Sequence, residues 1–415
     1  MIESAPARAD LIETVPGGVT APRGFRAAGV ASGLKRRPAT GDAPLDVALV
    51  VADGPASAAA VFTTNRVVAA PVLVSREHLE RSGGRARAVA INSGCANACT
   101  GAEGVDVARE MARATAEAVG CAPEHVLIAS TGVIGVALDP QKVRTGIMAA
   151  SRALGRDGAD AARAIMTTDP FPKATAVTVR GAEGTFTVGG MAKGSGMIEP
   201  RMATMLGLVT TDAEVEPAVL GGALRRVVKE TFNAITVDGE CSTNDCVFLL
   251  ASGRSGVAVR RDDDPIFLEG LRVVAGHLAR EIVRGGEGAT KLVTVRVTGA
   301  ATDADAWLAA RTIANSPLVK TAIHGGDPNW GRLVAAAGRS GAAFELGCVS
   351  VSVGPVPLFV RGVPHDDRAE QAAAVLQAPE VTVSVNLGTG GSHEATMWTC
   401  DFSADYVRIN AEYRT

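Results

Sequence analysis

The chain has 415 residues, of which 47% are hydrophobic and 20% charged, so it can bury a sizeable core and is long enough for two domains. A formal net charge of -3 provides no basic surface for nucleic acid. No uncharged apolar run reaches the length of a membrane span, and residues 1–10 lack the apolar segment of a signal peptide, so we expect a cytoplasmic protein without a membrane partner.

The first half of the chain alternates between strand and helix patterns. Short apolar runs predict buried strands, and apolar residues spaced three and four apart predict amphipathic helices. The expected elements are a strand over 45–51, a helix over 104–119, a strand over 125–129, a helix over 159–166, and a hairpin of two strands over 174–180 and 184–189.

The second half continues the alternation. Pro217 suits the first turn of a helix, and Asp303 is expected to cap another. The expected elements are helices over 218–232, 265–284 and 304–313, and strands over 247–251, 292–297, 349–353, 381–387 and 396–402. Mixed elements of this kind predict an α/β protein with two mixed domains, whose strand order the pattern leaves open.

Seven cysteines are scattered along the chain, at positions 95, 99, 121, 241, 246, 348 and 400. Cys95 and Cys99 have a CxxxC spacing, but no second cysteine or histidine pair completes a zinc site. We therefore expect reduced, mostly buried thiols and no bound metal.

A threonine near the midpoint is a candidate nucleophile. Flexible glycines lead to Thr204, which precedes a β-branched run at 209–211. Its hydroxyl can attack the carbonyl of Ala203, and hydrolysis of the resulting ester frees the Thr204 amine to act as a base for the same hydroxyl. Composition alone favours an ordinary loop before a buried strand, because Ala-Thr pairs are common. Glu199 and Arg201 are expected to form a solvated pair on this loop.

Two glycine-rich motifs near the C-terminus invite other chemistry. His324 and Asp327 suggest a metal site or a catalytic dyad, but without HExxH or a further ligand a structural turn packed on Trp330 is favoured. The stretch 388–391 resembles a phosphate-binding loop, but no helix pattern follows it closely, so we expect a turn.

The string KGSGMIEPRMATML, at 193–206, resembles the cleavage and nucleophile motif of the ornithine acetyltransferases of arginine biosynthesis, the glutamate N-acetyltransferase family. The resemblance extends along nearly the whole chain, and several long strings in one order make it specific. The other matching strings are NSGCANACTG at 92–101, IASTGVIG at 128–135, AIMTTDPFPK at 164–173, FNAITVDGECSTND at 232–245, GEGATK at 286–291, NSPLVKTAIHGGDPNWGR at 315–332 and INAEYRT at 409–415.

The resemblance implies a self-processing fold of the N-terminal-nucleophile type. Cleavage between Ala203 and Thr204 would give an α chain, 1–203, and a β chain, 204–415, which stay together in an α₂β₂ assembly. It also implies that Thr131 and the backbone N–H of Gly132 stabilise the oxyanion, although a simple strand-to-loop turn would explain that pair from spacing alone.

The resemblance also implies a set of substrate contacts. Lys193 would face an α-carboxylate, and Glu287 would face the ornithine amino group. Thr167 matches a further substrate contact, for which its equally polar neighbour Thr168 is an alternative. The implied substrate-binding residues are Thr167, Lys193, Thr204, Glu287, Asn410 and Thr415.

The implied reaction is acetyl transfer from N-acetyl-L-ornithine to L-glutamate through an acetyl ester of Thr204, without a cofactor. Some family members also accept acetyl-CoA, and the sequence leaves this open. One alternative is a self-processing N-terminal-threonine aminopeptidase or amidase with water as the acceptor, against which GEGATK and INAEYRT argue. Another is a nucleotide-binding module that uses the glycines at 388–391, which the missing strand–loop–helix pattern disfavours.

Overall fold

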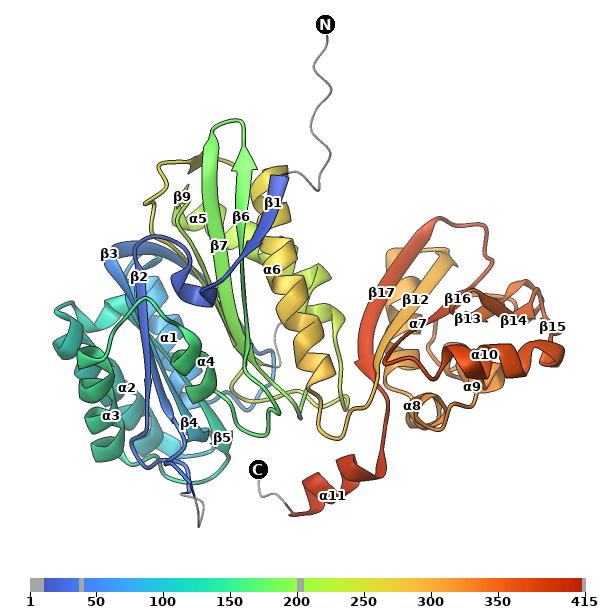
Figure 1. Cartoon of the computed structure of the whole chain (residues 1–415), viewed down its shortest axis with the longest axis horizontal. Coiled ribbons are helices and arrows are strands. Elements are labelled where there is room, and N and C mark those ends of the chain that lie inside the picture. Colours follow the sequence, from blue (N-terminus) through green and yellow to red (C-terminus); the bar gives the residue numbers. More distant parts are fainter. Residues whose placement is uncertain (1–10, 37–40, 200–204, 413–415) are drawn as a thin grey trace, which may run out of the picture.

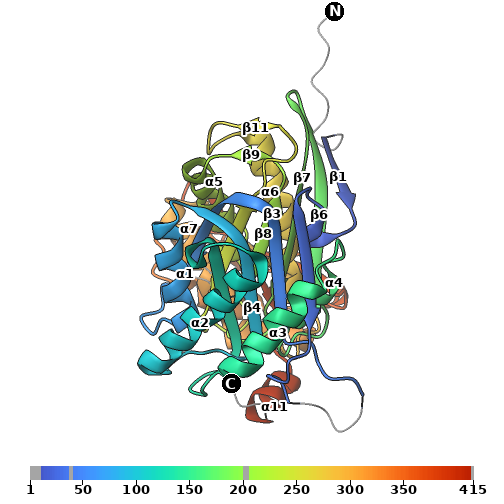
Figure 2. The same ribbon diagram turned by 90° about the vertical axis from the view of Figure 1, so that its left-hand side faces the viewer.

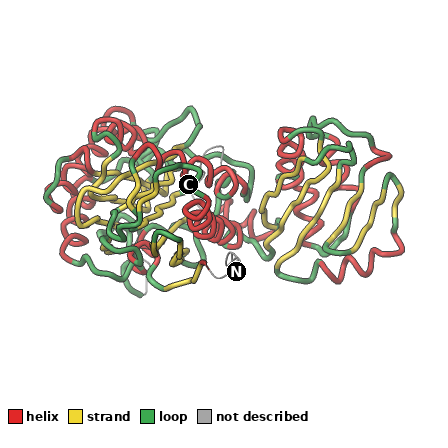
Figure 3. Tube along the Cα trace, turned by 90° about the horizontal axis from the view of Figure 1, so that it is seen from above, coloured by secondary structure: helices red, strands yellow, loops and turns green. Residues whose placement is uncertain are grey.

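The computed structural model describes residues 11–36, 41–199 and 205–412. It contains a nine-stranded sheet, a six-stranded sheet and a two-stranded ribbon, with helices packed on the larger sheets. Figure 1 shows the two large sheets in separate bodies, with the C-terminal segment returning beneath the first, and Figure 3 shows the same two bodies from above. The predicted α/β class with two mixed domains is confirmed.

The nine-stranded sheet has the order β1-β6-β7-β8-β10-β3-β4-β5, with β2 paired to β3. Two neighbouring pairs are parallel, β8 with β10 and β4 with β5, and the others are antiparallel. Its strands are β1 (Ile12–Val15), β2 (Phe25–Val30), β3 (Val47–Phe62), β4 (Arg85–Cys95), β5 (Val126–Val133), β6 (Lys173–Gly181), β7 (Gly184–Lys193), β8 (Leu206–Thr211) and β10 (Cys246–Ala251). The ribbon pairs β9 (Glu214–Val215) with β11 (Ala258–Val259).

Both faces of the nine-stranded sheet are covered. In β3, Leu49 packs into a core shared with α2 and α3, whereas the next residue, Val50, packs into a different core. Helix α6 contacts β6 and β7, and α5 contacts β3 (Figures 1 and 2). The helices are α1 (Ala70–Arg81), α2 (Gly101–Val119), α3 (Pro140–Arg152), α4 (Ala159–Ala164), α5 (Pro217–Glu230) and α6 (Pro265–Arg284). Burial on both faces explains why every residue of β8 and β10 is buried, rather than every second one.

The predicted cleavage position does not separate two folded bodies. Strands β8 and β10, which follow Thr204 in the chain, lie in the sheet between β7 and β3, which precede it. Along its full length, Leu206 to Thr211, β8 pairs with β7 on one side and with β10 on the other. The two halves of the sequence therefore share one sheet.

The six-stranded sheet has the order β15-β14-β13-β16-β12-β17 and its own apolar core. Its strands are β12 (Leu292–Ala300), β13 (Ser350–Val353), β14 (Val356–Val360), β15 (Val363–Pro364), β16 (Glu380–Asn386) and β17 (His393–Cys400). The helices between its strands are α7 (Asp303–Ala314), α8 (Pro317–His324), α9 (Trp330–Gly338) and α10 (Ala369–Val375). The last helix, α11 (Ala404–Glu412), follows β17 and lies beneath the first body (Figure 1). The glycines at 388–391 form a turn between β16 and β17, as expected.

Several local predictions are confirmed, and others are wrong. Helix α6 has the predicted bounds, and β6 and β7 form the predicted hairpin. Asp303 is not the N-cap of α7: the Thr302 side chain accepts a hydrogen bond from the backbone N–H of Asp305, and Asp303 is the first helical residue. The seven cysteines all lie in the described part of the chain and none is in a disulfide, but Cys99 and Cys348 are exposed. Among the described residues, no helix is long and apolar enough to cross a membrane.

Candidate active site

One pocket gathers the described residues that the sequence resemblance implied. It is lined by Thr131, Gly132, Thr167, Thr168, Lys193, Glu287 and Asn410, together with Met205 and Leu206. These residues come from the end of β5, the loop between α4 and β6, the end of β7, the start of β8, the loop after α6, and α11. Ala203, Thr204 and Thr415 lie outside the described residues, although Met205, which immediately follows Thr204, borders the pocket.

Thr131 and Gly132 lie at the end of β5 rather than in a turn, and their conformation is fixed. Gly132 has φ = 126°, and a Cβ there would lie 2.4 Å from the backbone carbon of Gly94, so the position requires glycine. The Asn244 amide, just before β10, donates to the backbone carbonyls of Ala96 (2.6 Å) and Ser130 (2.8 Å). Asn244, from the second half of the chain, therefore holds the end of β5 in place.

The ammonium of Lys193 donates to the hydroxyl oxygen of Thr131 at 2.9 Å. An ammonium has three donors and no acceptor, so the Thr131 hydroxyl must accept this bond and its own hydrogen remains free to be donated elsewhere. Burial lowers the pKa of Lys193 below its ordinary value, although the carboxylate of Asp169 favours the charged form. The contact leaves the hydroxyl hydrogen of Thr131, a residue that lines the pocket, available to another acceptor.

A buried ion pair that sequence reasoning missed lies behind Lys193. Asp169 and Lys173 are in contact at 2.6 Å, with both side chains fully buried. Asp169 also accepts hydrogen bonds from the backbone N–H groups of Thr167 (3.0 Å) and Gly194 (2.7 Å). Although burial raises the pKa of Asp169, the ammonium groups of Lys193 and Lys173 hold it below its ordinary value. This carboxylate thus positions two stretches of the pocket wall.

Glu287 is buried rather than exposed, and its carboxylate faces the loop at 194–196. The Asn410 amide, on α11, donates to Glu287 Oε2 at 2.8 Å. A Cβ at Gly196 would lie 2.4 Å from the same oxygen, so Gly196 allows this close approach. The backbone N–H of Glu287 donates to the Ser195 carbonyl at 3.0 Å. The structure therefore brings Glu287 and Asn410, far apart in sequence, to one wall of the pocket.

The stretch 193–199 is held firmly, which corrects two expectations. The Ser195 hydroxyl donates to the Gly285 carbonyl at 2.7 Å. A Cβ at Gly194 would lie 3.0 Å from Ile198 and one at Gly196 2.4 Å from Glu287, so these glycines serve close packing. Glu199 is buried and lies 3.4 Å from Arg311 and 2.8 Å from the Asn315 amide, so it is not a solvated residue. Its expected partner, Arg201, lies outside the described residues.

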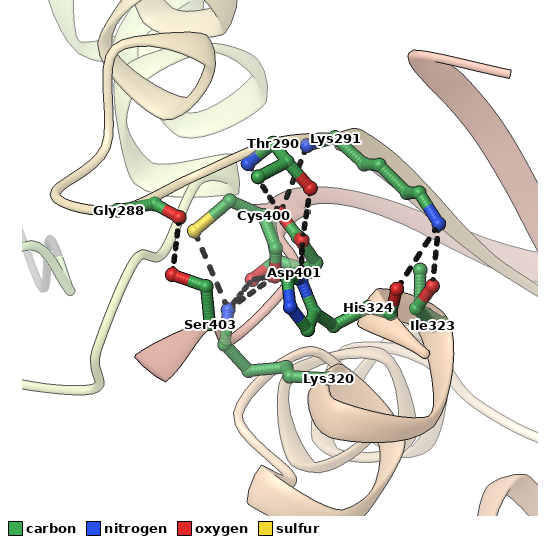
Figure 4. Close-up of polar contacts among 10 residues, drawn as sticks. Gly288, Thr290, Lys291, Lys320, Ile323, His324, Cys400, Asp401 and Ser403 are labelled. Carbon is green, nitrogen blue, oxygen red and sulfur yellow. Dashed lines mark hydrogen bonds and ion pairs between the residues drawn. The ribbon is translucent and has the colours of Figure 1, made fainter. Parts of the chain in front are cut away.

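A polar cluster at the end of β17 fixes the loop that carries Glu287 (Figure 4). Asp401 accepts hydrogen bonds from the backbone N–H groups of Thr290 (2.7 Å) and Lys291 (2.8 Å). The His324 ring nitrogen Nδ1 lies 2.7 Å from the other Asp401 oxygen. His324 is thus a structural partner of Asp401, and among the described residues no three metal-ligating side chains gather.

Asp245 is a further pocket residue without a sequence signal. It is 2% exposed and immediately precedes β10, and its Oδ2 has no hydrogen-bond partner in the described part of the chain. Burial raises its pKa well above the ordinary value. A protonated carboxyl at this point can donate as well as accept a hydrogen bond in the pocket.

A model of the ArgJ family matches residues 26–415. The chain belongs to the ArgJ family. It is 50% identical over 408 residues to the arginine biosynthesis bifunctional protein ArgJ of Symbiobacterium thermophilum, covering 97% of this chain and 100% of the relative. It is 48% identical over 397 residues to the protein of the same name from Chlorobaculum tepidum, covering 95% and 96%.

Two solved structures of such proteins are also similar to parts of this chain. The arginine biosynthesis bifunctional protein argJ of Bacillus halodurans is 44% identical and covers 51% of this chain and 100% of its own, with a TM-score of 0.49. The ornithine acetyltransferase of Mycobacterium tuberculosis, complexed with ornithine, is 42% identical and covers 46% and 100%, with a TM-score of 0.42.

Family membership confirms the predicted class of enzyme. This member of the ArgJ family is an acetyltransferase of arginine biosynthesis, rather than a self-processing aminopeptidase or amidase.

Proposed function

We propose that this pocket transfers the acetyl group of N-acetyl-L-ornithine to L-glutamate, and that Thr204 is the nucleophile. The observation that carries the proposal is the arrangement of opposite charges around one small pocket. The Lys193 ammonium lies on the Thr131 side, and the buried Glu287 carboxylate lies on the Asn410 side. A donor with one carboxylate and one side-chain ammonium matches both charges.

The first half-reaction forms an ester. The Thr204 hydroxyl attacks the acetyl carbonyl while the Thr204 α-amine takes the hydroxyl proton. Thr131 Oγ–H and the Gly132 N–H stabilise the negative charge on the carbonyl oxygen, for which the Lys193 contact orients the Thr131 hydroxyl. The bond from the acetyl carbon to the ornithine nitrogen then breaks, and that nitrogen takes the proton from the α-amine as ornithine leaves.

The second half-reaction returns the enzyme to its starting state. The amine of glutamate attacks the ester carbonyl, and the same donors stabilise the new oxyanion. The ester bond to Thr204 breaks, the Thr204 hydroxyl regains a proton from the attacking amine, and N-acetylglutamate leaves. Acetyl-CoA entering as a second donor would form the same ester and release the free thiol.

The processing step uses the same hydroxyl. Thr204 Oγ attacks the Ala203 carbonyl, the peptide C–N bond breaks, and the Thr204 nitrogen takes the proton. Water then hydrolyses the ester, leaving a carboxylate on Ala203 and a free Thr204 hydroxyl. We propose that the two products, 1–203 and 204–415, stay together through their shared sheet and, as the family resemblance implies, associate as α₂β₂.

A single assay tests the proposed reaction. Purified protein is incubated with N-acetylornithine and glutamate, and the products are separated by liquid chromatography and identified by mass spectrometry. N-acetylglutamate and ornithine in equal amounts are expected. Free acetate without N-acetylglutamate would instead indicate hydrolysis, and acetyl-CoA in place of N-acetylornithine tests the second donor.

Thr131→Ala is expected to lower kcat for acetyl transfer by roughly 10²–10³, because one oxyanion donor is lost. KM should change little, since this donor acts mainly on the transition state. Thr131→Ser, which keeps the hydroxyl, is the matched control and should stay close to wild type. Steady-state kinetics on each variant measure both constants, and an unchanged kcat in Thr131→Ala would remove Thr131 from the reaction.

A further inference from the structure

The chain just before the predicted cleavage position is bound by a segment from the second half. The backbone N–H of Val237 donates to the Ile198 carbonyl at 2.7 Å, and the N–H of Glu199 donates to the Glu240 carbonyl at 2.8 Å. The Thr236 hydroxyl donates to the Ile198 carbonyl as well, at 3.0 Å. Residues 236–240 therefore align 198–199 by both backbone and side-chain hydrogen bonds.

Asp238 contributes a carboxylate to this contact. Its Oδ2 accepts from the backbone N–H of Met197 at 2.7 Å, and its Oδ1 accepts from the N–H of Ile198 at 2.8 Å. Hydrogen bonds from two consecutive amides to one carboxylate are charge-assisted and therefore stronger than bonds between neutral groups. The Tyr406 hydroxyl, on α11, donates to Oδ2 at 3.3 Å and holds the carboxylate from the other side.

The residue that Asp238 holds has a strained backbone. Met197 has φ = 56°, a left-handed conformation that side chains other than glycine rarely adopt. Its neighbour Gly196, which could adopt that conformation freely, is not among the residues with positive φ. Contacts, rather than local preference, thus place the bend at Met197, and strain held in this way is typical of functional sites.

The segment on the other side of the predicted cleavage position is anchored as well. The backbone N–H of Cys246 donates to the Met205 carbonyl at 3.1 Å, and Leu206 begins the pairing of β8 with β7 and β10. Residues 199 and 205 are therefore both attached to the folded body. The rate at which a hydroxyl attacks the preceding carbonyl depends steeply on the distance and orientation of the two groups. Anchoring the chain on both sides therefore affects this rate.

We propose that Asp238 is a positioning residue for self-cleavage, because its carboxylate holds the strained bend at Met197 and Ile198 that leads to the Ala203–Thr204 bond. The inference rests on the proposed self-processing and adds a residue that acts on that step through the backbone. It assigns Asp238 no covalent part: the bonds that form and break are those of the Thr204 hydroxyl, the Ala203 carbonyl and water.

The test measures the rate of cleavage. Freshly synthesised full-length protein is sampled over time, and denaturing mass spectrometry gives the ratio of the intact chain to its two products. Asp238→Asn keeps the size of the side chain but removes the charge and turns one acceptor into a donor facing a backbone N–H. Its cleavage half-time should be at least roughly tenfold longer than that of the wild type.

Asp212→Asn is the matched control. Asp212 is buried, whereas Asp238 is partly buried, and like Asp238 it accepts hydrogen bonds from backbone N–H groups. Its donors are Thr187 (2.7 Å) and Arg23 (3.1 Å), which do not belong to the loop before the cleavage position. The melting temperatures of both variants are compared in a Thr204→Ala background, where no cleavage occurs. Equal slowing of cleavage by the two variants would mean that general destabilisation is responsible and would overturn the proposal.

A second variant tests the bend itself. Glycine adopts positive φ without help, so Met197→Gly added to Asp238→Asn should recover part of the lost cleavage rate. A double variant that cleaves no faster than Asp238→Asn alone would contradict the role of the bend. If Asp238→Asn is cleaved as fast as the wild type, only the role of Asp238 is overturned. If the wild type is active but is never cleaved, the proposed self-processing is overturned as well.

Discussion

Thr204→Ala is expected to give a protein that remains one chain and transfers no acetyl group. One hydroxyl is needed both to attack the Ala203 carbonyl and to carry the acetyl ester, so its removal should abolish both activities. Denaturing mass spectrometry should show a single 42.3 kDa chain for the variant and two products, 1–203 and 204–415, for the wild type.

Thr204→Ser is the matched control for the loss of this hydroxyl. Serine keeps the nucleophilic oxygen, so this variant should still be cleaved and should retain part of its transfer activity. The fold of Thr204→Ala is checked by its melting temperature, which should lie near that of the wild type. A fully active wild-type preparation that contains only the 42.3 kDa chain would rule out the proposed processing.

Glu287→Gln is expected to impair the use of N-acetylornithine. The substitution keeps the shape of the side chain but leaves the ammonium of the ornithine part without its counter-charge in a buried site. Loss of one partner of a buried charge pair costs about 2–5 kcal/mol, so kcat/KM for N-acetylornithine should fall by a factor of roughly 30 or more. The Asn410 amide, which donates to Glu287, can still do so to the glutamine oxygen, so the fold should be little disturbed.

Two comparisons give the Glu287→Gln result its meaning. Self-cleavage should proceed, because Glu287 has no part in the attack on Ala203. Glu281→Gln removes a carboxylate that is paired with Arg284 near the end of α6, and it should leave kcat/KM at the wild-type value. An unchanged kcat/KM in Glu287→Gln would show that this carboxylate does not recognise the substrate.

Local patterns were sufficient for some elements and not for others. Helix α6 has a strong periodic pattern with Pro265 at its start and glycine at its end, and its bounds were predicted correctly. Strand β3 was expected to end at residue 51 but continues to Phe62 through glycine, proline and several alanines, which are poor strand formers. The pairing of Ser57 to Phe62 with β10 keeps this part extended, and that partner is almost 200 residues away in the chain.

In the pocket, too, some residues could be located from the sequence and others only from the fold. Recognisable strings located Thr131, Lys193 and Glu287, and the structure brings them together. The carboxylates that hold the surrounding loops, such as those of Asp169 and Asp238, accept hydrogen bonds from backbone N–H groups. Every residue except proline has a backbone N–H group, so the sequence does not show which residue will donate to a given carboxylate. Only the fold shows which loop the carboxylate supports.

The interleaved order of β7, β8, β10 and β3 has a consequence for the enzyme as a pair of chains. Removing the second half would leave β7 and β3 with unpaired edges, separated by the width of two missing strands, and such edges promote aggregation. Halves produced separately should therefore be insoluble, whereas co-expressed halves should assemble. The cleaved chains should also stay associated when the enzyme is diluted for an assay. Specific activity should therefore be the same at high and at low enzyme concentration.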